Sequence, residues 1–219
     1  MDKLQSLFKM SEPLFREMAM QNIKDIRVYF DDNFADISAG FNSHVKKLYE
    51  LAKHQQAEGI KNPIDVLYIA YLRSSLKTGS YAYRLSLMGH EFYVDPTETE
   101  AYWSMPFMYS TVEQDIKQAV ESVKKQDRHM RLTDFDIKEL KYHYSQMYAF
   151  SSMFFLKDLA ANAIKTAKSE EWEAPEMTDS FSVAFGGHME TSYELYPVYR
   201  GFAETDGVGD ASKANEVLP

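Results

Sequence analysis

Residues 133–168 constrain the fold of this chain more than any other stretch, because apolar side chains recur there at the spacing of a helix. Thr133 followed by Asp136 matches the start of a capping box, which satisfies free N–H groups at a helix N-terminus. Mostly apolar and aromatic residues, with Ser151 as the polar exception, then advance in steps of three and four, through Ile137, Leu140, Tyr144, Met147, Ser151 and Phe154, flanked by Tyr148, Phe155, Leu159 and Ala163. The pattern predicts a long amphipathic helix with a wide aromatic face. It contains no recognisable catalytic motif.

Further helices are predicted between residues 11 and 125. Ser11 and Pro13 favour a helix start that runs to about residue 32, and a second apolar periodicity covers 34–57. Pro63 suits a first helical position, and residues 64–72 are apolar almost all round, which indicates a central helix over 63–77. Asp95-Pro96 followed by Glu98 predicts another helix start, with a kink at Pro106 and a continuation through 112–125.

Alternating side chains predict two β-hairpins. In the first, Tyr81, Tyr83, Leu85 and Leu87 alternate with smaller or polar residues, and residues 89–94 turn and return. In the second, residues 181–185 alternate, Gly186-Gly187 provides a two-residue turn, and residues 188–193 return. The expected fold is α+β, with about six helices and two short antiparallel hairpins that form one small sheet. We expect a single mostly helical domain over 1–202, with residues 195–202 packed on it, and a flexible tail over 203–219.

Composition excludes several classes of function. The net charge of −9 opposes contact with a phosphate backbone, so we expect no nucleic-acid partner. The order helix, helix, hairpin over 34–94 resembles a winged helix-turn-helix, but the segment 63–77 lacks the basic side chains of a groove reader. Cysteine is absent, which excludes disulfides and thiolate sites. Neither a signal peptide nor an uncharged membrane-spanning stretch is visible, so a soluble cytoplasmic protein without a membrane partner is expected.

Metal and cofactor signals are weak. Glu139 and His143 lie four residues apart on the long predicted helix, and His188 and Glu190 alternate on a predicted strand. Di-iron bundles place Glu and His three apart, which this chain does not do, so these pairs are more simply solvated polar faces. Walker loops, dinucleotide fingerprints and nucleophile elbows are all absent from the sequence. We therefore expect no metal and no cofactor.

Two arginines in apolar surroundings are the best sequence candidates for a site. Arg73 follows the apolar segment, and Arg84 lies among tyrosines and leucines. One interpretation is a structural ion pair with Asp65, Asp95 or Glu91. The other is a pocket in which Arg73 or Arg84 binds a ligand carboxylate beside aromatic side chains, namely Tyr68, Tyr71 and Tyr83.

The sequence thus favours a non-catalytic intracellular protein that senses a small ligand or binds a protein partner. The expected site is an aromatic groove between residues 63–77, 81–94 and 134–168, and wide helical faces are compatible with a homodimer. The alternative is an enzyme that acts on a small molecule in the same groove, with Tyr142, His143 and Tyr144 as acid–base candidates. His143 is favoured among them because it borders the apolar stripe.

Overall fold

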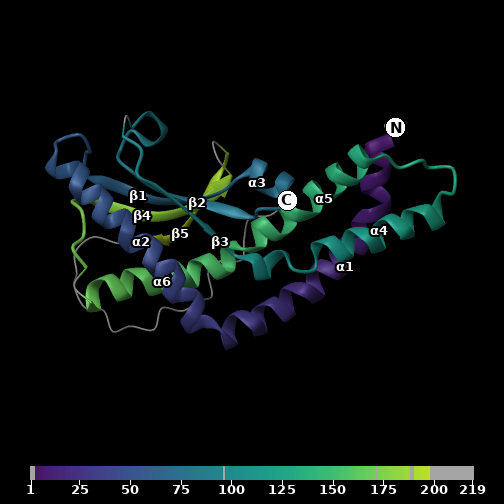
Figure 1. Cartoon of the computed structure of the whole chain (residues 1–219), viewed down its shortest axis with the longest axis horizontal. Helices are drawn as coiled ribbons and strands as arrows, with labels where there is room; N and C mark the ends of the chain where they lie inside the picture. The colour runs from purple at the N-terminus through teal and green to yellow at the C-terminus, as the bar shows by residue number, and fades with distance from the viewer. Residues whose placement is uncertain (1–2, 96, 171, 188–189, 198–219) are drawn as a thin grey trace.

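The computed structural model describes residues 3–95, 97–170, 172–187 and 190–197 (Figure 1). The fold is α+β: within this described part, a mixed five-stranded sheet packs one of its faces against helices. The helices are α1 (Lys3–Asp32), α2 (Phe34–Ala57), α3 (Arg73–Thr78), α4 (Val112–Gln126), α5 (Asp134–Ser151) and α6 (Met153–Ser169), with short 3-10 turns η1 (Phe92–Val94) and η2 (Pro106–Tyr109). The strands are β1 (Ile64–Tyr71), β2 (Ala82–Met88), β3 (Glu100–Ser104), β4 (Met177–Gly187) and β5 (Ser192–Pro197).

The sheet has the strand order β3-β2-β1-β4-β5, with β1 at its centre. Strand β1 pairs antiparallel with β2 and parallel with β4, while β2–β3 and β4–β5 are antiparallel. Leu67 and Ile69 of β1 belong to the main hydrophobic core, whereas Val66, Tyr68 and Ala70 form a small buried cluster on the opposite face. Strand β1 is therefore buried on both faces.

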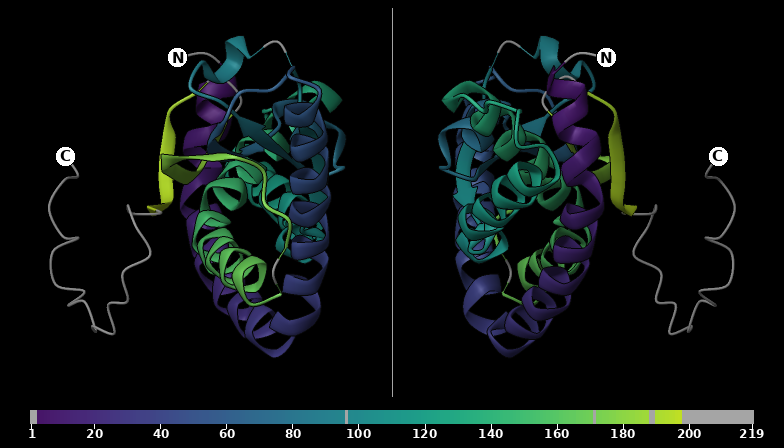
Figure 2. Two further views of the ribbon diagram at one scale, coloured as in Figure 1. Left: turned by 90° about the vertical axis from the view of Figure 1, so that its left-hand side faces the viewer. Right: turned by 90° about the vertical axis from the view of Figure 1, so that its right-hand side faces the viewer.

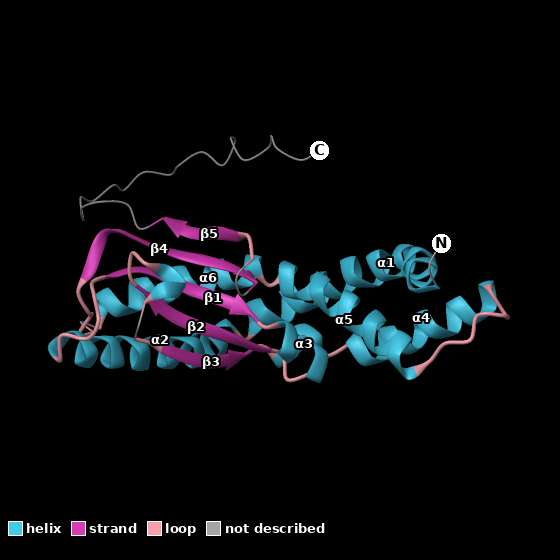
Figure 3. Ribbon diagram, turned by 90° about the horizontal axis from the view of Figure 1, so that it is seen from above, coloured by secondary structure: helices cyan, strands magenta, loops and turns pink. Residues whose placement is uncertain are grey.

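The helices fall into a part that supports the sheet and a part that extends beyond it. Viewed from above, the sheet lies over α2 and α6, while α1, α4 and α5 continue away from it (Figure 3). The end-on views show the sheet on one side of the helical layer (Figure 2). Aromatic side chains fill the joint between the two parts: Phe30 of α1 packs edge-on against Phe155 of α6, with ring centroids 5.0 Å apart. Among the described residues, no helix is both long and apolar enough to cross a membrane.

The helical prediction over 133–168 is confirmed, with one interruption. Thr133 and Asp136 form the expected capping box at the start of α5. The segment divides into α5 and α6 at Ser152, whose buried hydroxyl donates to the carbonyl of Ala149 at 2.6 Å. A hydroxyl that bonds back to a helical carbonyl competes with the helical hydrogen bonds, which accounts for the break at this position.

The predicted central helix over 63–77 is wrong. Residues 64–71 form strand β1, and only 73–78 are helical. A strand covered on both faces is apolar at consecutive positions, so it loses the alternation by which strands are recognised. The central position of the segment was right, but its backbone conformation was not.

The first predicted hairpin is wrong in its second half, and so is the helix start at Asp95. Residues 82–88 are a strand, but the chain then passes through η1 and returns at β3, where a helix was expected. The Asp95 carboxylate does accept the backbone N–H of Thr97, at 3.0 Å, as a helix cap would. Here that hydrogen bond closes a turn instead, because Asp95 is also paired with Lys61.

The second predicted hairpin exists, with a shifted turn. Strands β4 and β5 pair antiparallel, but Gly186 and Gly187 are the last residues of β4, and the return begins at Ser192. The two predicted hairpin regions do share one sheet, joined through β1. At the other end of the chain, α1 starts at Lys3 rather than near Ser11. The predictions for His188, for residues 198–202 and for the tail 203–219 lie outside the described residues.

Candidate functional site

The candidate site lies where the parallel strands β1 and β4 end side by side. Tyr71 of β1 is paired with Gly187 of β4 at this edge. Ligands of open sheets bind outside the carboxyl ends of parallel strands, where side chains from separate segments converge. A cavity of about 600 Å³ occupies this position, and we call it the strand-end cavity; it is lined by Tyr71, Phe150, Phe185, Gly186, Gly187, Glu190, Thr191 and Tyr193.

The two glycines at the end of β4 allow this edge to be built. A Cβ on Gly187 would collide with the carboxylate of Glu190 and lie 2.9 Å from the Tyr71 hydroxyl. A Cβ on Gly186 would lie 2.6 Å from the carbonyl oxygen of Thr191 and 2.8 Å from the hydroxyl of Tyr68. Glycine in a strand often marks such a close approach. The polar groups of the site therefore pack directly on the β4 backbone.

Glu190 is the polar centre of the cavity. The Tyr71 hydroxyl donates to one carboxylate oxygen at 2.7 Å, and the Arg73 Nε donates to the other, also at 2.7 Å. Tyr68 supports the same edge from the opposite face of the sheet, because its hydroxyl donates to the carbonyl of Gly187 at 2.8 Å. The side chain of Glu190 is 27% exposed and that of Arg73 is 67% exposed. Glu190 is thus held from inside by Tyr71 and covered from outside by an exposed arginine.

The protonation states follow from these contacts. Burial raises the pKa of the Tyr71 hydroxyl above its usual value of 10.0, and the adjacent Glu190 carboxylate raises it further. The hydrogen bond from Tyr71 lowers the pKa of Glu190 below its usual 4.5, and Arg73 adds to that effect. At neutral pH, Tyr71 therefore keeps its proton as a donor, and Glu190 carries a negative charge.

Aromatic rings form part of the remaining wall. Phe185 is fully buried in the core, and the Tyr71 ring lies 5.9 Å from it. Phe150 of α5 and Tyr193 of β5 pack edge to face with centroids 5.5 Å apart, and they are 46% and 42% exposed. Exposed aromatic rings that pack together form an apolar patch, and such patches mark contact sites for another molecule more often than single exposed residues do.

The structure brings together some of the sequence candidates and separates others. Tyr71 and Glu190 meet in the strand-end cavity, Arg73 pairs with Glu190 there, and Tyr68 bonds to the same sheet edge from the opposite face. Tyr142 lies next to this group: its ring carries the Lys77 ammonium of α3 at 5.0 Å, and its phenol contributes to the raised pKa values of Tyr71 and Arg73.

Arg84 and Tyr83 lie elsewhere. Tyr83 points into the helical core, where its hydroxyl bonds to that of Tyr109 at 2.8 Å. Arg84 lies on the opposite face of β2 and pairs with Glu100 at 3.0 Å. Both arginines thus have acidic partners, as the structural interpretation required, but the partners are Glu190 and Glu100 rather than the three acids proposed from the sequence.

The consecutive acid–base candidates on α5 point in different directions. The His143 ring stacks on Phe8 of α1 at 4.7 Å. The Tyr144 hydroxyl is buried and donates to Asp115 at 2.8 Å, and burial raises its pKa far above 10.0. Glu139 faces Lys77 at 3.6 Å, and in the described part of the chain no group of three or more His, Asp or Glu residues is placed to hold a metal.

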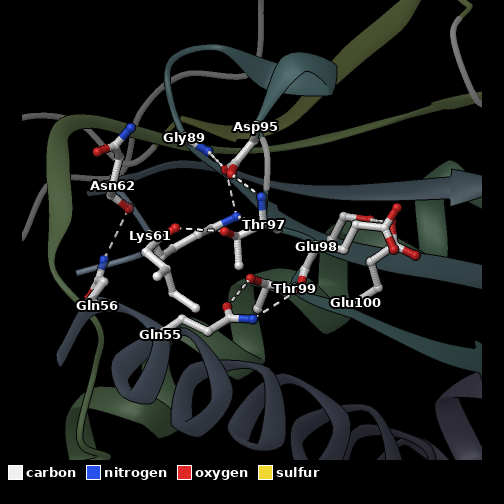
Figure 4. Close-up of polar contacts among 12 residues, drawn as sticks. Gln55, Gln56, Lys61, Asn62, Gly89, Asp95, Thr97, Glu98, Thr99 and Glu100 are labelled. Atoms are coloured by element: carbon white, nitrogen blue, oxygen red, sulfur yellow. Dashed lines mark hydrogen bonds and ion pairs between the residues drawn. The ribbon is translucent and has the colours of Figure 1, made fainter. Parts of the chain in front are cut away.

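A second cavity, of about 220 Å³, lies beneath the β2–β3 loop (residues 89–99). Several of its polar residues already bind one another or the neighbouring backbone (Figure 4). The buried Lys61 donates to the Asp95 carboxylate at 2.6 Å and to the Thr97 carbonyl at 2.7 Å, and Gln55 of α2 donates to the carbonyl of Glu98 at 3.1 Å. These contacts attach the loop to the body of the fold, so this cavity is the weaker candidate.

The sequence missed the aromatic wall of the strand-end cavity. Phe150 had no special signal, because its exposure depends on where α5 ends against β5. Gly186 and Gly187 were visible in the sequence, but they were interpreted as a hairpin turn. Comparisons of the chain with protein-family models, with curated proteins and with solved structures found no match. The functional argument therefore depends on the geometry of the site.

Proposed function

We propose that this chain is a small-ligand-binding protein and that the strand-end cavity is its binding site. One observation carries the proposal: an ionised carboxylate, fixed by the Tyr71 hydroxyl, faces a cavity with aromatic walls. Ligand sites combine mostly apolar walls with a few well-placed polar groups, in cavities of about 300–1,000 Å³. Glu190 and Tyr71 supply polar groups, and the exposed rings of Phe150 and Tyr193 supply apolar surface beside them.

The protonation states support binding rather than catalysis. A general base works best when its pKa lies near the working pH. Tyr71 has its pKa raised away from neutrality, and Glu190 has its pKa lowered away from it. Both groups are therefore suited to hold a ligand in a fixed orientation, and neither is tuned to exchange a proton at neutral pH.

The wider proposal retains a cytoplasmic location, which is in keeping with a chain that contains no cysteine. A homodimer also remains part of the proposal. Phe154, near the start of α6, is exposed and offers apolar surface for contact with a second copy.

A small-molecule screen by thermal shift tests the function. Compounds that raise the Tm of the wild type should lose their effect in Gly187→Ala, because the new Cβ displaces the Glu190 carboxylate. Gly40→Ala is the matched control, since a Cβ there meets only the Trp103 indole nitrogen, at 4.0 Å. The proposal fails if the compounds that stabilise the wild type stabilise Gly187→Ala equally, or if a broad screen yields none.

A further inference from the structure

We infer that the strand-end cavity selects small organic cations, in which an ammonium or amidinium group is attached to an aromatic or apolar body. This inference rests on the proposed binding function and specifies its ligand class. It follows from the charge of the cavity, from its aromatic walls and from the pairing of the Glu190 carboxylate with Arg73.

The first step is the charge. Among the described lining residues, Glu190 is the one that carries a formal charge, and it is negative. A carboxylate accepts hydrogen bonds and donates none, so its natural partner is a cationic N–H group. The net charge of −9 for the whole chain adds a weaker, long-range attraction for cations.

Second, the Glu190 carboxylate is paired with Arg73. The guanidinium of Arg73 pairs with Glu190 but does not line the cavity. The Arg73 side chain is 67% exposed, so few contacts hold it in place. Exposed ion pairs contribute little to stability, because both partners are well solvated when apart. A ligand cation that enters from the cavity side can therefore take the place of Arg73 at Glu190, while Tyr71 keeps its hydrogen bond to the other oxygen.

The third step is the wall. The faces of aromatic rings attract cations, and the attraction increases when water is excluded. Tyr71, Phe150 and Tyr193 place rings around the same space as Glu190. A ligand with a flat apolar body would cover the exposed surfaces of Phe150 and Tyr193 while its cationic end meets the carboxylate.

An anionic ligand fits the site poorly. Arg73 would have to leave Glu190 to bind it, and the ligand charge would then lie close to an unpaired carboxylate. The sequence-based hypothesis that Arg73 binds a ligand carboxylate is therefore replaced by the opposite polarity, with Glu190 as the ligand anchor.

Three probes of the same shape and different charge test the inference by isothermal titration calorimetry: benzylammonium, benzyl alcohol and benzoate. Benzylammonium should bind most tightly. Glu190→Gln keeps the shape of the side chain and should weaken benzylammonium binding by about tenfold or more. Arg73→Gln removes the competing cation and should tighten binding by about two- to fivefold. Glu173→Gln, at another exposed glutamate that pairs with a lysine, Lys53, is the matched control and should change nothing.

The outcomes separate this inference from the broader proposal. Tighter binding of benzoate or benzyl alcohol, or weaker benzylammonium binding in Arg73→Gln, overturns the cation assignment and leaves the binding function standing. If no probe binds and the broad screen is also negative, the binding function itself is wrong. Because Arg73 is exposed, its variant tests the assignment even if Glu190→Gln proves poorly folded.

Discussion

Replacing Lys61 with methionine should remove a large share of the stability of this protein. The Lys61 side chain is 1% exposed, and the Asp95 side chain with which it pairs is 10% exposed. Methionine preserves most of the length and apolar contact of the lysine but removes its charge. The Asp95 carboxylate is then left buried, where it still accepts hydrogen bonds from the backbone N–H groups of Gly89 and Thr97, at 3.2 and 3.0 Å.

The magnitude follows from the pairing. Removal of one partner from a buried ion pair costs about 3–5 kcal/mol, because the other charge remains without compensation. The backbone donors retained by Asp95 place the expected loss at the lower end, at about 3 kcal/mol. A native domain is stable by about 5–15 kcal/mol, so the Lys61→Met variant should still fold.

The loss should also depend on pH. Burial opposes the ionisation of Asp95, but the hydrogen bonds from Lys61 and from the Thr97 and Gly89 backbone outweigh it and hold the pKa below its usual 3.8. Without Lys61 the desolvation remains, and the pKa of Asp95 should rise above 3.8. The variant then relieves its unpaired charge by taking up a proton, so the stability difference from wild type is full at neutral pH and shrinks toward pH 4.

Urea unfolding at about pH 7 and pH 4, followed by circular dichroism, measures both quantities. Asp95→Asn and the double variant complete the thermodynamic cycle and isolate the coupling between the two side chains. A loss below about 1 kcal/mol at neutral pH, or an equal loss at both pH values, would refute the argument that this pair is a desolvated charge pair.

Four further outcomes are expected. Gly40→Ala, in the interior of α2, should raise the free energy of unfolding by about 0.5–1 kcal/mol in urea titrations, because alanine favours the helix and its Cβ meets nothing closer than the Trp103 indole nitrogen, at 4.0 Å. Gly186→Ala should lower it by about 1–3 kcal/mol, since the new Cβ meets backbone at 2.6 Å; a neutral result contradicts that packing. The hydrogen bond from Lys3 is the strongest of the interactions that hold the pKa of Asp136 at about 2. The contribution of Asp136 to stability is therefore fully present above pH 3.8 and disappears as the pH falls through 2. The Tm gap between wild type and Asp136→Asn should therefore close in strong acid, as thermal scans would show. Benzylammonium binding should stay constant down to about pH 5 and weaken below 4.5 as Glu190 takes up a proton, and a calorimetric pH series would reveal any other profile.

Local signals predicted the helices well, because they depend on neighbours in the sequence. The capping box at Thr133 and Asp136 and the stripe that follows it are both present in α5. The helix predicted over residues 64–71 was wrong for a physical reason. Periodicity reports how many faces of an element are buried, and a central strand and a central helix are both buried on every face. The β-branched residues Ile64, Val66 and Ile69 were the available evidence for a strand, and short length was a second sign.

The candidate site was only partly predictable. Tyr68, Tyr71 and Arg73 could be selected because polar groups in an apolar segment need partners. Glu190, the partner of Tyr71 and Arg73, lies more than a hundred residues away along the chain, and it is brought close by the parallel pairing of β1 with β4. No local pattern encodes a pairing between such distant strands, so the place of the Glu190 carboxylate in the proposed site is visible only in the fold.

A crystal structure of the protein with benzylammonium is the decisive measurement for the assignment of Glu190 as a cation site. The ligand nitrogen should lie about 3 Å from the Glu190 carboxylate. The ligand ring should lie against Phe150 and Tyr193, with Tyr71 still donating to Glu190. A ligand found in the cavity beneath the β2–β3 loop, or one whose nitrogen avoids Glu190 while Arg73 remains in place, would contradict it.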